Sequence, residues 1–297
     1  LPKGYQISQY EQPLAVNGHL TILTENGEKN VRIRRVHLEE DTGKLTHVFH
    51  DQESYSLVDL NRAGVPLLEI VTEPDMHSAE DVRQFAMSLR SVMRYLGVNS
   101  GDMQKGVMRV EPNVSVRLVG SQQLGTRTEI KNLNSFRALE RSIDYEIDRQ
   151  SQALDRGETI DQQTLGWDEA LGKTLVQRSK EEAHDYRYFP EPDLPPLVIE
   201  PNFIEKIRKS LPELPDARLK RFQDQFQLTP YEAGVLTANR EVADFFEDVV
   251  GKSDHFTPKT AVNWITGELF NLLNQSGKEI IDIPITPLQF AELLNLV

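Results

Sequence analysis

The chain contains no cysteine, which excludes disulfide bonds, thiolate metal sites and a cysteine nucleophile within its 297 residues. A chain without thiols fits a reducing cytosol. No stretch approaches the ~18 consecutive apolar residues of a membrane-spanning helix, and no signal sequence is visible. Charged residues make up 27% and hydrophobic residues 38%, which is ordinary for a soluble globular protein.

Positive charge is also scarce. The chain has 33 basic and 46 acidic residues, for a net charge of −13. This balance argues against a non-specific nucleic-acid binder, which needs surplus Lys and Arg to contact phosphates. Residues 31–35 and 218–221 could form local basic patches for RNA, although each could equally be a solvated face.

The pattern along the chain predicts an α+β fold in which a mixed or antiparallel sheet domain precedes an all-α domain. The predicted strands are residues 31–38, 55–60, 65–72, 107–118, 126–132 and 185–189. Two helices are predicted between them. One follows Ser78 and ends near Gly97, and the other follows Ser135 and runs toward Gly157 as a charged outer helix.

The proline-rich residues 189–196 cannot form a helix and are predicted to close the sheet domain as an extended wall. Beyond about residue 205 the pattern is helical throughout. Thr-Pro pairs at residues 229–230, 257–258 and 286–287 predict helix starts, with threonine as the cap and proline in the first turn. Val262, Ile265, Leu269 and Leu272 are predicted core positions. The chain opens on Leu1 and ends within an apolar helical pattern, so we expect a fragment trimmed at both ends.

Glu69 is the most unusual single residue. It lies in the apolar run of residues 64–71, which predicts a buried strand. An ionised carboxylate there is costly unless a cation pairs with it. Further acids occur at residues 39–41 and at Glu111 and Glu129, and acids converging on one cleft would suit Mg²⁺ and phosphate chemistry.

Residues 108–118 alternate polar and apolar side chains. The polar face carries Arg109, Glu111, Asn113, Ser115 and Arg117. Such a face could line a cleft for a phosphorylated ligand, or it could simply face solvent. Pro112 would mark a bulge or a sheet edge.

A second polar strand, residues 126–132, leads directly into the second helix. The start of a helix offers backbone N–H groups to an anion. Lys131, Asn132 and Asn134 are therefore candidates for phosphate or ribose contacts, although Asn also caps helices without any ligand. Residues 171–174 resemble the end of a P-loop, but Gly166 lies one residue too far upstream, and we reject that motif.

Four long motifs, taken together, resemble the B subunit of the aspartyl/glutamyl-tRNA amidotransferase. They are residues 55–62, 66–75, 129–136 and 185–193, and they occur in the order found in that family. The resemblance covers essentially the whole chain. It implies a catalytic cradle domain over residues 1–205, a helical domain over 206–285, and the start of a tail domain over 286–297.

The resemblance implies a cytoplasmic, bacterial-type enzyme that works with two further proteins, the glutaminase or A subunit and the small C subunit. The B subunit would use ATP and Mg²⁺ to phosphorylate the side-chain carboxylate of Glu-tRNA(Gln) or Asp-tRNA(Asn). Ammonia released from glutamine by the glutaminase would then form the amide. Positioning and charge neutralisation are what phosphoryl transfer mainly requires.

The resemblance also implies roles for particular residues. Glu40 and Glu69 correspond to metal-site carboxylates, and Glu111 and Glu129 to acids needed for activation. Contacts to the nucleotide or acyl group are assigned to Arg109, Asn113, Ser115, Lys131, Asn132 and Asn134, and Lys3 to the ammonia route. Family members commonly have Asp-x-Asn where this chain has Glu111-Pro112-Asn113.

Two other functions fit the residues without the resemblance. One is a carboxylate–amine ligase acting on a small molecule, which would turn over without tRNA. The other is a non-catalytic tRNA-binding subunit, which would tolerate Glu129→Gln.

Overall fold

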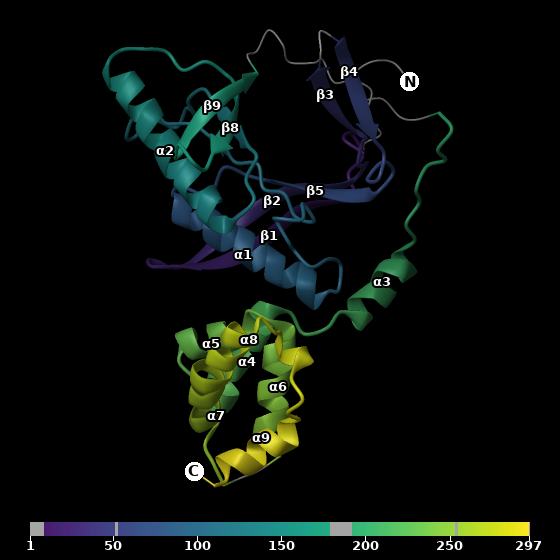
Figure 1. Cartoon of the computed structure of the whole chain (residues 1–297), viewed down its shortest axis with the longest axis vertical. Helices are drawn as coiled ribbons and strands as arrows, with labels where there is room; N and C mark the ends of the chain where they lie inside the picture. Colours follow the sequence, from purple (N-terminus) through teal and green to yellow (C-terminus); the bar gives the residue numbers. More distant parts are fainter. Residues whose placement is uncertain (1–8, 51–52, 179–191, 253–254, 297) are drawn as a thin grey trace. The chain divides into compact units, whose positions relative to one another are not determined.

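The computed structural model describes residues 9–50, 53–178, 192–252 and 255–296. The chain divides into two compact units, described separately below. Unit 1 comprises residues 1–85 and 110–198, and unit 2 comprises residues 86–109 and 199–297. Unit 1 contains all the strands assigned in the described residues, and unit 2 is helical (Figure 1), so the α+β class is confirmed.

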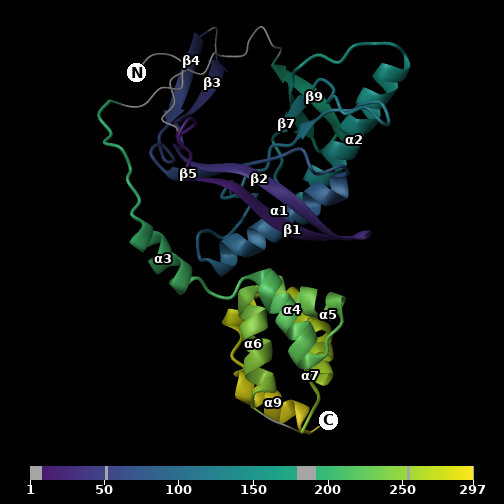
Figure 2. The same cartoon turned by 180° about the vertical axis from the view of Figure 1, so that it is seen from behind.

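The first sheet of unit 1 has the strand order β1-β2-β5 and is antiparallel throughout. Its strands are β1 (Ala15–Thr24), β2 (Gly27–Glu40) and β5 (Pro66–Thr72). Figure 2 shows the three strands side by side. Ile22 and Val31 are buried in it. The strands predicted at residues 31–38 and 65–72 are confirmed.

The burial predicted for β5 is wrong. Glu69 keeps 48% of its side chain exposed, and its neighbour Leu68 is 43% exposed. The physical reason is the position of the strand. Among the described strands β5 pairs with β2 alone, so it is an edge strand rather than a central one. Apolar residues on such a strand do not guarantee burial on both faces.

The second sheet is the hairpin of β3 (Lys44–His50) and β4 (Glu53–Asp59), which confirms the strand predicted at residues 55–60. The third sheet is mixed and has the order β6-β7-β8-β9. Its strands are β6 (Asn113–Val114), β7 (Thr128–Lys131), β8 (Thr164–Asp168) and β9 (Lys173–Arg178). Strands β7 and β8 run parallel, and the crossover between them contains helix α2.

The long strand predicted at residues 107–118 is largely wrong. Only Asn113 and Val114 pair, with Glu129 and Thr128 of β7. Pro112 immediately before them has no N–H to donate to a ladder. The polar–apolar alternation nevertheless persists, since Val114 is buried while Asn113 is exposed. The strand predicted at residues 185–189 lies outside the described residues.

Both helices predicted in the first two thirds of the chain are confirmed. They are α1 (Ala79–Tyr95) and α2 (Phe136–Asp155). The hydroxyl of Ser135 caps α2 by accepting a hydrogen bond from the amide of Ala138. Helix α2 is an outer helix with one buried face, and that face contains Leu139 and Ile143 together with polar Glu146 and Gln150.

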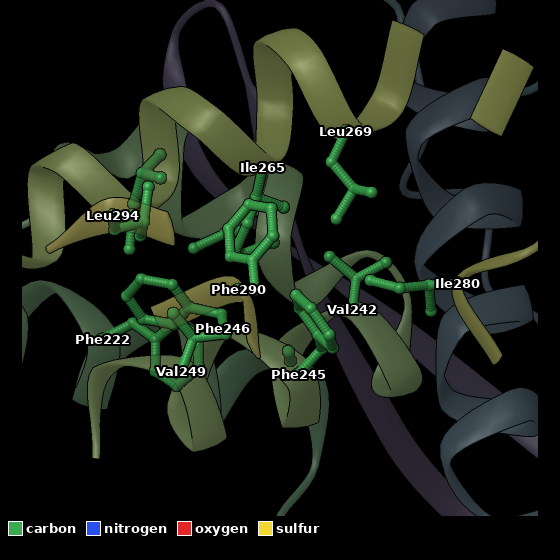
Figure 3. Packing of buried hydrophobic residues seen from close by; sticks show 14 of the residues in the cluster. Phe222, Val242, Phe245, Phe246, Val249, Ile265, Leu269, Ile280, Phe290 and Leu294 are labelled. Carbon is green, nitrogen blue, oxygen red and sulfur yellow. The ribbon is translucent and has the colours of Figure 1, made fainter. Parts of the chain in front are cut away.

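Unit 2 is built of short helices around one apolar core (Figure 3). They are α3 (Pro201–Ser210), α4 (Pro215–Phe226), α5 (Pro230–Thr237), α6 (Arg240–Val250), α7 (Pro258–Trp264), a π-helix (Ile265–Leu269), α8 (Phe270–Ser276), a 3₁₀ helix (Ile280–Asp282) and α9 (Pro287–Leu294). Thr229, Thr257 and Thr286 cap α5, α7 and α9 as predicted, each with proline in the first turn.

The π-helix explains one error in the predicted core. Val262, Ile265 and Leu269 are buried as expected, but Leu272 is 57% exposed and Leu273 is buried in its place. The wider π turn falls immediately before α8, where it delays the apolar face by one residue. In the described part of the chain, no helix combines the length and apolar character that crossing a membrane requires.

Candidate functional site

The first cluster of functional side chains follows from the register of β2 and β5. His37 of β2 lies directly opposite Glu69 of β5. Glu39 lies two residues further along β2, so it projects from the same face of the sheet as His37. In the described residues, the one group of three possible metal-ligating side chains is His37, Glu39 and Glu69.

The geometry of this cluster centres on the buried imidazole of His37, which is only 1% exposed. Its Nε2 lies 2.9 Å from Glu69 Oε2 and 3.1 Å from Glu39 Oε1. Its Nδ1 has no hydrogen-bond partner among the described residues. Burial and the adjacent Glu69 carboxylate raise the pKa of Glu39 above its ordinary value, although His37 opposes the shift. The three ligand atoms lie within 4.8 Å of one another, close enough to share one cation.

Glu40, assigned to a metal site by resemblance, lies outside this group of three. It follows Glu39 in β2 and pairs with Pro66, so its Cβ projects from the opposite face. The structure thus brings Glu69 together with Glu39 rather than with Glu40. Sequence reasoning missed His37 and Glu39 as a pair with Glu69. Strand alternation along residues 37–39 could have placed His37 and Glu39 on one face of the sheet. Only the β2–β5 register shows that Glu69 lies on that face as well.

The second cluster lies on the mixed sheet. Lys131 Nζ is 2.7 Å from Glu111 Oε2 and 3.4 Å from Glu129 Oε1. Glu129 and Lys131 share a face of β7, and Asn113 of β6 is paired directly opposite Glu129. The Thr164 hydroxyl of β8 also donates a hydrogen bond of 3.2 Å to Glu129. The structure therefore gathers three of the predicted site residues in one cluster centred on the lysine and places Asn113 beside them.

Lys131 remains a cation in this setting. Burial by itself would lower the pKa of its ammonium group, but the hydrogen bond to Glu111 and the charges of both glutamates raise the pKa above its ordinary value. About 38% of the Lys131 side chain, 40% of Glu111 and 33% of Glu129 stay exposed. The cluster is thus accessible to a ligand and carries paired acids around a fixed positive charge.

The other predicted contact residues have more varied settings. Asn132 adopts a left-handed backbone (φ 65°), and its amide donates to the carbonyl of Trp167 at 3.2 Å. Asn134 is exposed next to the capping Ser135. Arg109 is exposed and Ser115 half-buried. Lys3 and most of the motif at residues 185–193 lie outside the described residues.

Residues 171–174 confirm that no P-loop is formed there. They lie at the turn and first residues of the β8–β9 hairpin, where Asp168 pairs with Lys173. A P-loop instead leads from a strand into a helix N-terminus.

Unit 1 is thus an α+β unit that carries two carboxylate clusters, one around His37 and one around Lys131. Comparison with known families then gives its membership. The GatB/GatE catalytic domain matches residues 1–205, and the GatB domain matches residues 244–297. The chain belongs to the GatB/GatE catalytic domain family, and the resemblance seen in the four sequence motifs is confirmed.

Individual relatives agree over the whole chain. The chain is 54% identical over 297 residues to the B subunit of the aspartyl/glutamyl-tRNA(Asn/Gln) amidotransferase of Thermomicrobium roseum. It is 51% and 52% identical to the proteins of the same name from Carboxydothermus hydrogenoformans and Caldanaerobacter subterraneus. All of this chain is covered in each comparison. The chain spans 61% of the first relative's length and 62% of the other two.

Proposed function

We propose that this chain is the activating part of the B subunit of a tRNA-dependent amidotransferase. The observation that carries the proposal is the similarity of the whole chain, at 54% identity, to a relative with that name. In the proposed reaction, a side-chain carboxylate oxygen of Glu-tRNA(Gln) or Asp-tRNA(Asn) attacks the γ-phosphorus of ATP and ADP leaves. Ammonia then attacks the acyl carbon, and phosphate leaves as the amide forms.

The lysine cluster, formed by Glu111, Glu129 and Lys131, supports an electrostatic role for this chain in phosphorylation of the substrate carboxylate. Phosphoryl transfer needs positioned charges more than covalent help from the protein. Lys131 would neutralise charge on the transferring phosphoryl group, and Glu111 and Glu129 would orient the lysine and the substrate amine. Asn113, held opposite Glu129, adds a hydrogen-bonding amide at the same place. Arg109, Ser115, Asn132 and Asn134 remain proposed contacts to the nucleotide or acyl group.

The histidine cluster supports a divalent cation. Two carboxylates and one imidazole form an oxygen-rich donor set. Mg²⁺ bound there would keep further coordination positions for water and phosphate oxygens. The imidazole would also suit Mn²⁺ or Zn²⁺. His37, Glu39 and Glu69 would hold the ion, and the ion would supply further charge neutralisation at the phosphates. Glu40 stays the alternative ligand, and titration of the Glu39→Gln and Glu40→Gln variants with Mn²⁺ separates the two.

The proposal includes the assembly in which the chain works. Ammonia would come from the glutaminase or A subunit, along a route to which Lys3 is assigned, and the small C subunit would complete the complex. We also propose a cytoplasmic location and the division into a cradle (1–205), a helical domain (206–285) and the beginning of a tail domain (286–297). The match to the catalytic domain over residues 1–205 and the change to helices after residue 200 support the first boundary of this division.

The test uses full-length protein assembled with its partner subunits. The assembly receives Glu-tRNA(Gln) or Asp-tRNA(Asn), Mg²⁺, ammonium and either ATP or no nucleotide, and the amino acid recovered from the tRNA is identified. We expect ATP-dependent conversion of glutamate to glutamine or aspartate to asparagine. Conversion of neither tRNA would contradict the proposal and favour a binding subunit.

The residue assignment needs a matched pair of variants. Glu129→Gln should leave tRNA binding intact and abolish ATP-dependent activation. Glu158→Gln is the control, because Glu158 forms an exposed ion pair with Arg156 outside the lysine cluster. An unchanged amidation rate in the Glu129→Gln assembly would remove Glu129 from the site. Turnover of free glutamate without tRNA would instead favour a small-molecule ligase.

A further inference from the structure

Helix α2 buries an unusual polar network against the mixed sheet. Thr128 of β7 and Glu146 and Gln150 of α2 are all 0% exposed. Buried polar groups are costly unless they are hydrogen-bonded, so a network of this kind constrains its neighbours closely. Its members belong to the strands and helix around the lysine cluster, which is where precise geometry would matter most.

Gln150 links β6 to β7 at the point where their ladder ends. Its Nε2 donates to the carbonyl of Val114 at 3.1 Å, and its Oε1 accepts from the amide of Val116 at 3.1 Å. Nε2 also donates to the hydroxyl of Thr128 in β7 at 2.9 Å, so the same amide binds both strands. β6 has only two residues, and in the described sheet it pairs with β7 alone. The carbonyl of Pro112 accepts from the amide of Ile130 in β7, so the carbonyl of Val114, two residues on, also faces β7. The side-chain amide of Gln150 therefore extends the short β6–β7 ladder beyond Val114 and holds this segment next to β7.

Glu146 fixes the orientation of that amide. Its carboxylate accepts hydrogen bonds from Gln150 Nε2 at 3.0 Å, from the Thr128 hydroxyl at 2.9 Å and from the Thr174 hydroxyl of β9 at 3.2 Å. Arg149 adds two further bonds, at 2.6 and 3.0 Å. Because a carboxylate accepts only, the NH₂ of Gln150 must face Glu146, and this leaves its oxygen for the amide of Val116.

The Glu146 carboxylate is also stabilised as an anion. Burial alone would raise its pKa, but the hydrogen bonds from Arg149, Gln150 and Thr128 outweigh burial and lower the pKa below the ordinary value. The network thus keeps Glu146 as an anion and the Gln150 amide in one orientation.

We propose that Gln150 and Glu146 are positioning residues that set the geometry of the Glu111–Lys131–Glu129 cluster by holding β6 against β7. The inference rests on the proposed function for its kinetic consequences. Gln150 binds residues 114–116, which directly follow Asn113. Glu146 binds Thr128, which directly precedes Glu129. A shift of either strand would change the distances from Lys131 to the two glutamates.

The test compares three variants in the full-length assembly: Gln150→Ala, the milder Thr128→Val, and Ile143→Ala as control. Ile143 is buried on the same face of α2, so its truncation also leaves a cavity. At a temperature at which every variant is folded, we expect Gln150→Ala to lower kcat for ATP-dependent amidation by roughly 100-fold, the loss that a misplaced group can cause. KM for the aminoacyl-tRNA should stay within about twofold, because only positioning changes.

Thr128→Val should lie between Gln150→Ala and wild type, and Ile143→Ala should keep kcat within about threefold of wild type. Equal losses of kcat in Gln150→Ala and Ile143→Ala at equal thermal stability would overturn the proposal, since the effect would then be general destabilisation. Wild-type kcat in both Gln150→Ala and Thr128→Val would overturn it as well.

A second readout does not depend on activity. In Gln150→Ala, amide hydrogen exchange should rise across residues 110–131 and stay unchanged across residues 15–40 of the first sheet. If the wild-type assembly proves inactive, the proposed function fails, while this exchange pattern still decides whether Gln150 holds β6. Unchanged exchange over residues 110–131 would refute the role of Gln150.

Discussion

Lys131 and Glu111 form a close charge contact on the mixed sheet, with 2.7 Å between the ammonium nitrogen and the carboxylate Oε2. The two residues are twenty positions apart, and the pairing of β6 with β7 brings them together. Glu129 approaches the same nitrogen from the side at 3.4 Å. One cation thus lies within 3.4 Å of two carboxylates, which is an arrangement suited to handling a charged substrate.

Replacing Lys131 should therefore disable the site without unfolding it. Lys131→Met removes the charge between Glu111 and Glu129, and we expect kcat for ATP-dependent amidation in the assembly to fall roughly 100-fold, as for other charge-stabilising groups. Lys131→Arg keeps the charge and should recover part of the rate. Lys206→Met in the exposed helix α3 is the control. If Lys131→Met amidates at the wild-type rate, Lys131 has no part in the reaction.

The histidine cluster gives a prediction that separates Glu39 from Glu40. Titration of full-length protein with Mn²⁺, followed by electron paramagnetic resonance, measures the free ion directly. Glu39→Gln and Glu69→Gln should each weaken binding by about tenfold or more, because each removes one of few protein ligands. Glu40→Gln, whose side chain starts from the other face of β2, should bind Mn²⁺ like wild type. The reverse order of effects would restore Glu40 as the ligand.

The sequence predicted most of the local structure correctly because local signals determine it. The hydroxyls of Ser135 and Thr229 cap helices as their positions indicate. The errors arose where tertiary context decides. Residues 65–72 form a strand, but its exposure depends on being at a sheet edge, which no local pattern reveals. Leu272 faces outward because a π turn precedes it.

The candidate site shows the same division. Glu111, Glu129 and Lys131 could be predicted because alternation and the motif placed them on polar faces. His37 and Glu39 could not be grouped with Glu69 without the β2–β5 register. Asn132 has an amide whose partner, the Trp167 carbonyl, lies thirty-five residues away. Long-range partners of this kind require the folded chain.

Tyr95 should make unit 2 sensitive to alkaline pH. Its buried hydroxyl donates to the carbonyl of Thr237 at 2.9 Å, and burial raises the pKa of the phenol to about 12, although Arg218 opposes the shift. A raised folded pKa gives stability that is fully present below the unfolded pKa, about 10, and is lost as the pH rises through about 12. The comparison is the free energy of unfolding of wild type and Tyr95→Phe between about pH 8 and pH 12.

At about pH 8 we expect Tyr95→Phe to be less stable by about 1 kcal/mol, for the lost hydrogen bond. The difference should shrink above about pH 10 and vanish or reverse near pH 12. Absorbance in the near ultraviolet, where phenolate absorbs, should show one phenolate fewer at the highest pH. A difference that stays constant across the range would mean that Tyr95 ionises alike in both states.

The capping box of α5 gives a stability prediction independent of function. The Thr229 side chain accepts a hydrogen bond from the amide of Glu232, and the Glu232 carboxylate accepts one from the amide of Thr229 at 2.9 Å. Thr229→Ala should lower the free energy of unfolding by about 1 kcal/mol in urea, as other cap removals do. Thr229→Ser keeps the hydroxyl and should restore most of it. Because α5 packs next to Phe222 in the unit 2 core, equal stability of Thr229→Ala and wild type would show that packing alone holds this helix end.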